Sequence, residues 1–337
     1  MRTLRVILIC GACVATFGCA ASGGSDARSG VVPSTRAASH DLPLVYAVNE
    51  YGFSATAYRQ SANGNVSPVI DIAGSQTKIY QPAGLAVNRQ GTAAVTNRQN
   101  DITFYAPGAN GNVAPIATLA CPSGGPGVPA QLAFDARGDL YVKYYTGHQA
   151  PSDEIAVYQP NQQSGCVMST HVLYGNRTKI SVYGGIAVGG GMIYSASARK
   201  ILGFHTSDNG NVPPSIAIGG HNTGLRNANG IAVGKNGYLY VANSNNVLVF
   251  APSANGNATP VATIGGGRTL IPRRGLGTQS VAVAKNGKIF VGIQNYAATS
   301  SSILVFAAGS NGNVAPIQVI TGSNTGLDSI EELSVLD

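Results

Sequence analysis

The chain has 337 residues, and its 21 Lys and Arg against 14 Asp and Glu give a formal net charge of +7. Only 10% of the residues are charged, where a globular average is about 25%, and the basic residues are scattered rather than grouped in runs. Nucleic acid requires a basic stripe that neutralises successive phosphates, so this composition argues against a nucleic-acid-binding protein.

Residues 1–19 are predicted to be a signal peptide. Arg2 and Arg5 form a positively charged start, residues 6–17 form an apolar stretch, and small residues follow at 18–21. An apolar stretch of about 12 residues is too short to cross ~30 Å of hydrocarbon as a helix. We therefore expect export rather than insertion into the membrane.

The segment Thr16-Phe17-Gly18-Cys19 resembles a bacterial lipobox, in which a small residue precedes a cysteine that becomes acylated. The resemblance implies a lipid anchor on Cys19, and no other contact with the membrane. Thr16 and Phe17 depart from the motif, so cleavage near Ala20 without lipidation is the alternative. Residues 20–42, rich in Ser, Gly and Ala at their start, are expected to be a flexible linker to an anchored domain.

Two motifs repeat in phase through residues 43–337. A segment of the type Gly-Ile-Ala-Val occurs six times, at offsets of 47, 54, 45, 50 and 52 residues. The hexapeptide Asn-Gly-Asn-(Val/Ala)-x-Pro occurs five times, beginning at Asn63, Asn110, Asn209, Asn255 and Asn311. Repetition at this period predicts radial copies of one small sheet.

Each repeat contains signals for four short strands. The Gly-Ile-Ala-Val segment is followed by a turn with glycine and a second strand such as Leu239–Asn243. A third strand such as Val247–Phe250, the hexapeptide and a fourth strand complete the repeat. Asn-Gly and related pairs supply the positive φ angles of tight hairpin turns, so the strands are expected to pair antiparallel.

The two chain ends divide the last repeat between them. Residues 331–336 match a first strand, after which the chain stops, and residues 43–49 match a second strand. The sequence thus predicts an all-β, six-bladed β-propeller with four-stranded antiparallel blades, the last closed by one C-terminal and three N-terminal strands. Such a join leaves no exposed end strand.

The repeats Asn229–Phe250 and Pro82–Tyr105 resemble the NHL-repeat family of β-propellers. Blades of that family read Pro-x-Gly-Ile-Ala-Val, then Gly-x-Leu-Tyr-Val-Ala, then Asn-x-Ile-x-Val-Phe. The family's usual aspartate after Gly-Ile-Ala-Val is kept only as Asp135. The resemblance implies a disc that presents a ligand, and it names no particular ligand.

One face of the predicted disc carries the ends of the second strands and the starts of the first strands. Polar residues at these positions form a possible axial ligand site: Asn49, Asn97, Asn243, Asn229, Gln279, Glu331 and Glu332. The fold resembles gluconolactonase-type propellers, which implies a carboxylate-and-amide metal site, and calcium takes six to eight oxygen ligands. A recurring asparagine at a strand end more simply hydrogen-bonds its turn, so we expect no cofactor and keep calcium as the alternative.

Two further features of this face have competing interpretations. His221 with Glu331 or Glu332 can act as a general base, as in the streptogramin-lyase propellers that the repeats resemble. Serine occupies the equivalent position of two other loops, which favours a solvated histidine.

Basic inter-blade loops form a possible anion-binding face at Arg226, Arg268, Arg273 and Arg274, suited to an anionic glycan.

Cys121 and Cys166 are the cysteines outside the leader. An exported protein favours a disulfide between them. The repeat, however, places them at strand ends that point to opposite faces. These ends are separated by about five residues at ~3.3 Å each, which exceeds the ~7 Å limit on the Cα–Cα distance of a disulfide. We therefore expect the two thiols to remain unpaired.

Together these patterns predict a non-catalytic binding or scaffolding propeller of the bacterial cell envelope, located in the periplasm or at the outer membrane, or secreted. Its partner is expected to be an envelope protein or an anionic glycan. A metal-dependent lactonase or lyase is the alternative.

Overall fold

The computed structural model describes residues 43–120, 127–147, 153–181, 183–273, 277–294 and 301–337. The predicted leader, the linker and Cys19 lie outside the described residues, as do Cys121 and Arg274. The described part of the chain forms 24 β-strands and four single-turn 3-10 helices. No helix in it has both the length and the apolar character to cross a membrane.

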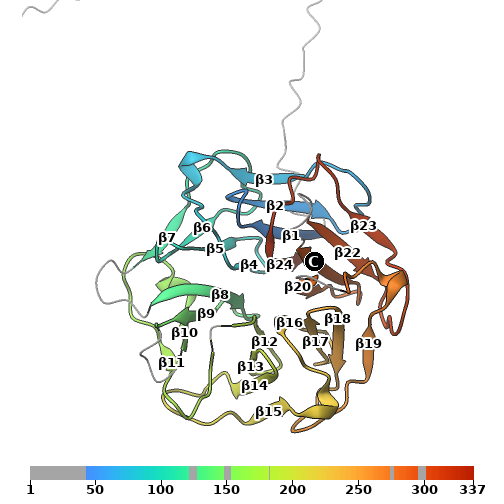
Figure 1. The fold of residues 1–337 in the computed structure, drawn as a ribbon. Coiled ribbons are helices and arrows are strands. Elements are labelled where there is room, and N and C mark those ends of the chain that lie inside the picture. The colour runs from blue at the N-terminus through green and yellow to red at the C-terminus, as the bar shows by residue number, and fades with distance from the viewer. Residues whose placement is uncertain (1–42, 121–126, 148–152, 182, 274–276, 295–300) are drawn as a thin grey trace, which may run out of the picture. The chain divides into compact units, whose positions relative to one another are not determined.

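The strands form six antiparallel sheets of four strands, arranged radially around one axis (Figure 1). This confirms the predicted all-β six-bladed propeller. In the order from the axis outward, blade 1 consists of β4 (Leu85–Val87), β5 (Ala93–Asn97), β6 (Asp101–Tyr105) and β7 (Ala117–Ala120), and blade 2 of β8 (Val128–Phe134), β9 (Leu140–Tyr145), β10 (Glu154–Tyr158) and β11 (His171–Leu173). Blade 3 consists of β12 (Ile186–Gly189), β13 (Met192–Ser197), β14 (Lys200–His205) and β15 (Ile216–Gly219), and blade 4 of β16 (Ala228–Val233), β17 (Leu239–Asn243), β18 (Asn246–Phe250) and β19 (Ala262–Ile264). Blade 5 consists of β20 (Gly277–Val283), β21 (Ile289–Gln294), β22 (Ser302–Phe306) and β23 (Gln318–Ile320), and blade 6 of β24 (Ile330–Leu336), β1 (Leu44–Asn49), β2 (Ser54–Arg59) and β3 (Ile70–Ala73).

Blade 6 is closed by the two ends of the chain, as predicted. Strand β24 pairs antiparallel with β1, with Leu336 opposite Leu44 and Leu333 opposite Ala47. The innermost strand of this blade therefore comes from the C-terminus and its three outer strands come from the N-terminus. The end strand of the repeat array has a partner, so no edge remains open between the first and last repeats.

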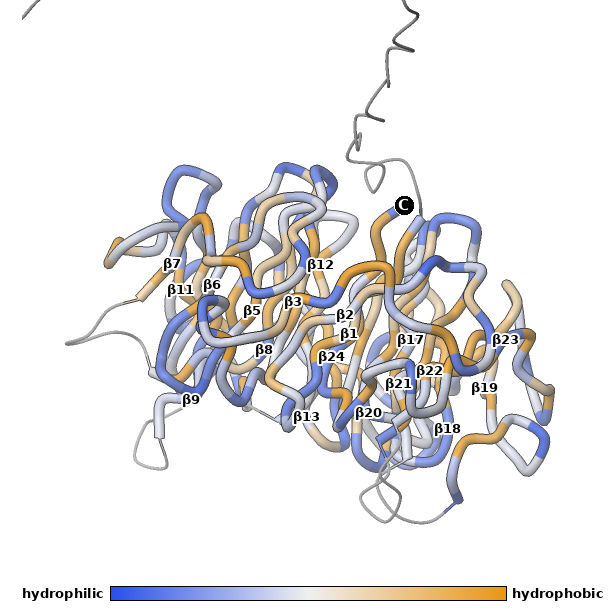
Figure 2. Tube along the Cα trace, turned by 90° about the horizontal axis from the view of Figure 1, so that it is seen from above, coloured by the Kyte–Doolittle hydropathy of each residue, from blue (hydrophilic) through white to orange (hydrophobic). Residues whose placement is uncertain are grey.

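The hydrophobic core lies between neighbouring blades. The third strand of each blade carries a large aromatic side chain near its end, and all six are at most 3% exposed: Tyr58, Tyr105, Tyr158, Phe204, Phe250 and Phe306. Burying one such side chain contributes ~1.5–3 kcal/mol. Figure 2 shows hydrophilic segments at the loops on both ends of the strands, where the chain meets water.

The repeated hexapeptide is a clasp between blades. Its first Asn accepts a hydrogen bond from a backbone N–H of the preceding blade's outermost strand, for example from Asp71 N to Asn110 Oδ1 at 2.8 Å. Its third residue, Asn112, accepts one from Gln76 N at 2.7 Å. The same pair of bonds recurs at the other four copies of the motif. At these five junctions the clasp therefore occupies the outer edge that the preceding blade leaves unpaired.

The junction from blade 1 to blade 2 has no Asn-Gly-Asn motif. At the other five junctions the motif's third Asn lies against a glycine that follows strand four; at Gly74 a Cβ would come within 2.6 Å of Asn112 Oδ1. In the sequence, Cys121 takes the place of this glycine and Cys166 takes that of the Asn.

Our expectation of unpaired thiols was wrong, because Cys166 is disulfide-bonded. The expectation assumed that the two cysteines lie as far apart as the strand ends next to them. Ala120 N donates to Gly165 O at 3.1 Å, so the turn of blade 2 reaches back to the end of β7 in blade 1. Cys121 itself lies outside the described residues.

Candidate functional site

β-bulges aim polar side chains at one end of the axis. In blades 2, 4, 5 and 6 the innermost strand carries one extra residue near its start, which is Ala130, Asn229, Gln279 or Glu331. A bulge turns a side chain out of the regular alternation, and bulges occur often beside functional sites. The equivalent positions of blades 1 to 3 hold Ala83, Ala130 and Gly184. The ring of six equivalent positions therefore carries polar side chains on one half and only Ala or Gly on the other, its bare half.

These side chains line a cavity of about 320 Å³, here called the mouth. Its lining comes from blades 1, 4, 5 and 6 and consists of Glu50, Tyr51, Ala83, Arg98, Asn227, Asn229, Gln279, Gln294 and Glu331. The volume lies at the lower end of the range of small-molecule sites. The face that contains it, the mouth face, is turned toward the viewer in Figure 1, and the C-terminus lies on the opposite side.

Two carboxyl groups meet in the mouth. Burial and the neighbouring Glu50 carboxyl raise the pKa of Glu331 above its ordinary value. Gln279 and Gln294 donate side-chain hydrogen bonds to the two oxygens of Glu331 at 3.1 and 2.9 Å, and Arg98 pairs with Glu50 at 2.9 Å. The Glu331 carboxyl therefore holds a proton more readily than an isolated carboxyl group.

Glu332 follows in the chain and points into the channel along the axis. This channel of about 210 Å³ is lined by the innermost strands of all six blades, and most of its lining residues have apolar side chains. Burial raises the pKa of Glu332 to about 8, although Ser280 Oγ donates to its Oε1 at 2.6 Å. At neutral pH the Glu332 carboxyl is therefore mainly protonated.

Exposed aromatic side chains stand beside the mouth. Tyr51 lines it and is 55% exposed, and Phe53 and Tyr80 pack with their ring centroids 5.3 Å apart. Phe53 has a φ of 47°, a left-handed conformation that is rare for a bulky residue. Strain of this kind gathers at ligand-contacting positions.

The structure divides the predicted axial residues into two groups. Asn229, Gln279 and Glu331 line the mouth, and Glu332 lines the channel. Asn49, Asn97 and Asn243 are buried and brace loops instead: Asn243 Oδ1, for example, accepts hydrogen bonds from the backbone of Arg226 and Asn227. Their recurrence reflects this shared bracing role.

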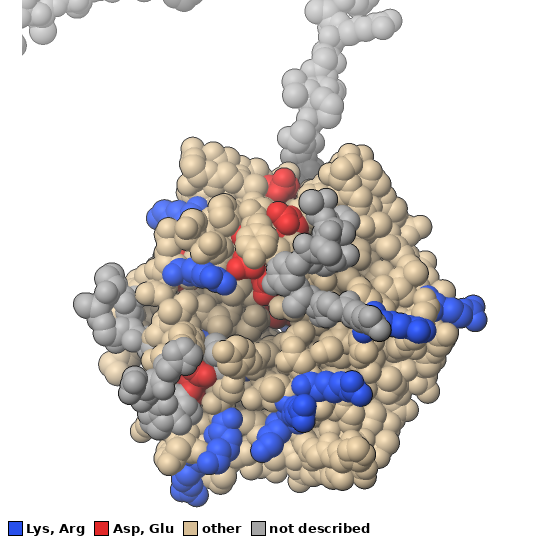
Figure 3. All heavy atoms as spheres, in the orientation of Figure 1, with Lys and Arg blue, Asp and Glu red and all other residues tan. Residues whose placement is uncertain are grey.

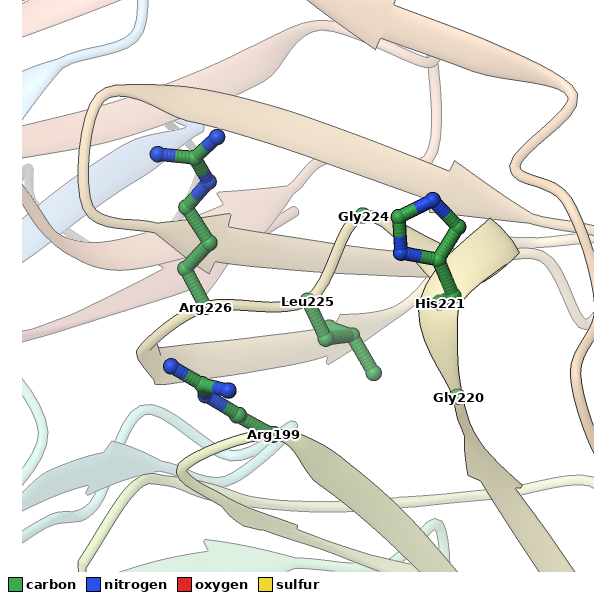
Figure 4. A pocket seen from close by; sticks show the side chains of 6 residues that line it. All are labelled: Arg199, Gly220, His221, Gly224, Leu225 and Arg226. Atoms are coloured by element: carbon green, nitrogen blue, oxygen red, sulfur yellow. The ribbon is translucent and has the colours of Figure 1, made fainter.

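A second, larger hollow of about 650 Å³ opens on the mouth face between blades 3 and 4. It is lined by Arg199, Gly220, His221, Gly224, Leu225 and Arg226 (Figure 4). Figure 4 shows Arg226 and His221 on the loop that joins β15 to β16, and Arg199 on the turn that joins β13 to β14. His221 therefore lines this hollow while Glu331 lines the mouth, so the structure does not bring the predicted His/Glu pair into one cavity.

Charge is segregated on the mouth face. Figure 3 shows most Asp and Glu in a band from the upper edge of the disc to its middle, and Lys and Arg mostly toward the rim elsewhere. Of the predicted anion-binding residues, Arg226, Arg268 and Arg273 are exposed and Arg274 lies outside the described residues. The described part of the chain contains no group of three or more His, Cys, Asp and Glu side chains that can hold a metal ion.

One buried cation belongs to the scaffold. Lys143 is fully buried, and its Nζ donates to the carbonyls of Tyr183, Gly184 and Ala196 in blade 3 at 2.8–3.3 Å. Desolvation lowers the pKa of Lys143 to about 7, while the three acceptors favour the ammonium form. It links blade 2 to blade 3.

Sequence reasoning missed Glu50, Tyr51, Arg98 and Arg199. Each lies just after the second strand of a blade, in a short turn toward the third strand. The repeat register places these turns on the mouth face, and that was the available signal. Gln294, at the end of β21, carried the same signal and was also missed.

No family model matches the chain, and no curated protein matches it. Among solved structures, a protein of unknown function from Bacteroides caccae is similar over 88% of this chain and 99% of its own, with a TM-score of 0.62 and 9% identity. The WD40 β-propeller domain of Doa1 matches over 75% of this chain and 90% of its own, with a TM-score of 0.48 and 13% identity. The first of these likenesses supports the fold alone.

Proposed function

We propose that the protein is a non-catalytic, NHL-like propeller of the bacterial cell envelope that binds a glycan-type ligand at the mouth. The observation that carries this proposal is that Asn229, Gln279 and Glu331, at the bulges of blades 4, 5 and 6, line one cavity. Blade 2 has the same bulge at Ala130, so the bulge belongs to the repeat, and it is the polar side chains at this position that distinguish blades 4, 5 and 6.

The chemistry of the mouth fits a polyhydroxylated ligand. Carboxyl, amide and guanidinium groups donate to and accept from sugar hydroxyls, and the exposed ring of Tyr51 offers a flat apolar surface beside them. The bare half of the ring, at Ala83, Ala130 and Gly184, leaves room for a ligand that is longer than the cavity.

The envelope location rests on the leader and on Cys19 in the sequence. The orientation of the propeller agrees with a tether, because β1 begins at Leu44 at the end of the blade away from the mouth. A chain anchored through the residues before Leu44 leaves the mouth uncovered.

The ligand test uses a printed array of neutral and acidic oligosaccharides. We expect wild type to bind at least one glycan, and Tyr51→Ala and Gln279→Ala to weaken that binding at least fivefold. Tyr238→Ala is the matched control, because this exposed tyrosine lies in the β16–β17 turn on the opposite face. Equal binding by all variants rejects the mouth as the site.

Two further readouts separate this proposal from an enzyme. We expect the bound glycan to be recovered uncleaved, and binding to survive EDTA. Cleavage of the glycan, or loss of binding that calcium restores, contradicts the non-catalytic proposal. For the anchor, Cys19→Ser should move the protein from the membrane fraction to the soluble fraction of expressing cells.

A further inference from the structure

The hollow between blades 3 and 4 lies in a sector of the disc that is almost free of acidic residues. Residues 155–327 contain 11 of the 21 Lys and Arg but only one of the 14 Asp and Glu, Asp208. Asp208 accepts a hydrogen bond from His205 N, in the turn that follows β14 on the face opposite the mouth. On the mouth face, the described part of this sector carries exposed bases with no acid: Arg177, Lys179, Arg199, Arg226, Arg268 and Arg273.

The hollow is built on a braced backbone. Ala228 N donates to Ala198 O at 2.8 Å, which joins the loop of Arg226 to the turn of Arg199. Asn243 holds Arg226 N at 2.7 Å, and Asn257 holds Asn222 N at 2.7 Å. The backbone that carries two arginines and a histidine around one opening is therefore braced before any ligand arrives.

The guanidinium groups that line the hollow have no acidic partner. Among the described residues, the ion pairs are those of Arg98 with Glu50 and of Arg137 with Asp135 and Asp139. Arg199 and Arg226 are not among them. Guanidinium groups bind carboxylate, sulfate and phosphate in bidentate geometry, and these hydrogen bonds are stronger than neutral ones.

The hollow and the mouth are adjacent. Arg226 lines the hollow, and the next residue, Asn227, lines the mouth. One ligand can therefore occupy both, with an anionic group in the hollow and uncharged hydroxyls against the acids and amides of the mouth.

We infer that the hollow formed by Arg199, His221 and Arg226 is a subsite for the oxyanion of an acidic oligosaccharide whose body lies in the mouth. A nucleic-acid strand fits less well, because its closely spaced phosphates would meet Glu50 and Glu331. The glycan identity rests on the proposed function, whereas anion binding in the hollow stands without it.

Isothermal titration with hexasaccharides tests the inference. The probes are a sulfated heparin-derived hexasaccharide, a carboxylated oligogalacturonate hexamer and an uncharged chitohexaose, each at 50 and 300 mM NaCl. An 18-nucleotide oligothymidine is the fourth probe. We expect at least one acidic hexasaccharide to bind about tenfold more tightly than chitohexaose, with the difference reduced at 300 mM NaCl. The stronger of the two acidic probes identifies the oxyanion.

The variants are Arg199→Gln and Arg226→Gln, singly and together. Both side chains are exposed, so the fold should persist, which circular dichroism checks. Each variant should weaken acidic hexasaccharide binding about tenfold and leave chitohexaose binding unchanged. Lys235→Gln is the matched control, because it removes an exposed charge of the same sector on the opposite face.

Three results overturn the inference: equal acidic hexasaccharide binding by wild type and the double variant, equal binding of charged and uncharged hexasaccharides, or tighter binding of oligothymidine than of either acidic probe. The mouth is tested separately in the same titration. If Tyr51→Ala and Gln279→Ala bind as wild type while the arginine variants fail, the mouth proposal falls and the hollow stands. The reverse pattern rejects the hollow alone.

Discussion

At the scale of single residues, the environment of Glu332 makes the stability of the propeller depend on pH. Its carboxyl keeps a proton up to pH of about 8 in the folded state, against an ordinary pKa of 4.5. The native state therefore binds more protons than the unfolded state between these values. The stability that comes from the protonated carboxyl is present below pH 4.5 and is lost as the pH rises through about 8.

Replacing Glu332 with Gln removes this dependence while keeping the shape and an acceptor for Ser280 Oγ. We expect Glu332→Gln to match wild type at pH 5 and to exceed it at pH 8.5 by ~1–3 kcal/mol in the free energy of unfolding. Urea denaturation from pH 5 to 9 measures this. Because Lys143 titrates in the opposite sense, the difference between the two proteins is the quantity to compare, and a flat difference contradicts the prediction.

Single residues also show the limits of sequence reasoning about the mouth. Glu331 and Gln279 were predicted there because the repeat register marks the start of the innermost strand. Glu50 and Arg98 were not, although they form the ion pair at the rim. Asn49, Asn97 and Asn243 share one repeat position and accept hydrogen bonds from loop backbone, which agrees with the simpler interpretation of a recurring asparagine at a strand end.

At the scale of elements, the Asn-Gly-Asn clasp accounts for the hexapeptide that occurs five times in the chain. Asn110→Ala and Asn112→Ala each remove one hydrogen bond between blades 1 and 6, so each should lower the free energy of unfolding by ~0.5–1.5 kcal/mol. Ile116→Thr is the control, because this neighbouring side chain is 62% exposed. Urea denaturation should show no effect of the control, and an equal effect of all three variants would argue against the clasp.

The disulfide of Cys166 lies at the junction of blades 1 and 2, where the Asn-Gly-Asn motif is missing, and Cys166 occupies the position of the motif's third residue, Asn. The equivalence of positions in the repeat predicts that its partner is Cys121, closing a loop of tens of residues that stabilises the protein by ~3–4 kcal/mol. Peptide mapping without reductant identifies the partner. The variant Cys121→Gly/Cys166→Asn restores the motif of the other junctions, so it should regain part of the stability that Cys121→Ser/Cys166→Ser loses. Equal thermal midpoints for the two double variants would contradict this equivalence.

At the scale of the whole molecule, closure of blade 6 decides whether the ring forms. Deleting residues 330–337 removes β24 and exposes the inner edge of β1, so we expect loss of cooperative unfolding. A permutant that joins Asp337 to Pro43 through a short Gly/Ser linker and opens the chain at Asn286–Gly287 creates the same one-plus-three closure in blade 5. Circular dichroism and thermal unfolding should show it folded, with a midpoint close to that of wild type. An unfolded permutant would show that closure in blade 6 has a special role.

The whole molecule also separates an acidic centre from a basic rim on the mouth face. The sequence shows the uneven distribution of acids along the chain, but only the ring brings the acid-free sector of blades 3 to 5 beside the acids of blade 6. This arrangement explains why a modest net charge is compatible with a strongly polarised face.

By itself, the sequence determined the blade count, the strand order within each blade and the joint between the chain ends. These follow from local signals, since hairpin turns and alternating strands repeat within each 45 to 54 residues of chain. Only the tertiary structure decided which side chains share a cavity and how Cys166 is bonded. Glu50 meets Glu331 within blade 6, where the two chain ends pair, and Ala120 meets Gly165 across the boundary between blades 1 and 2. No local pattern encodes those distances.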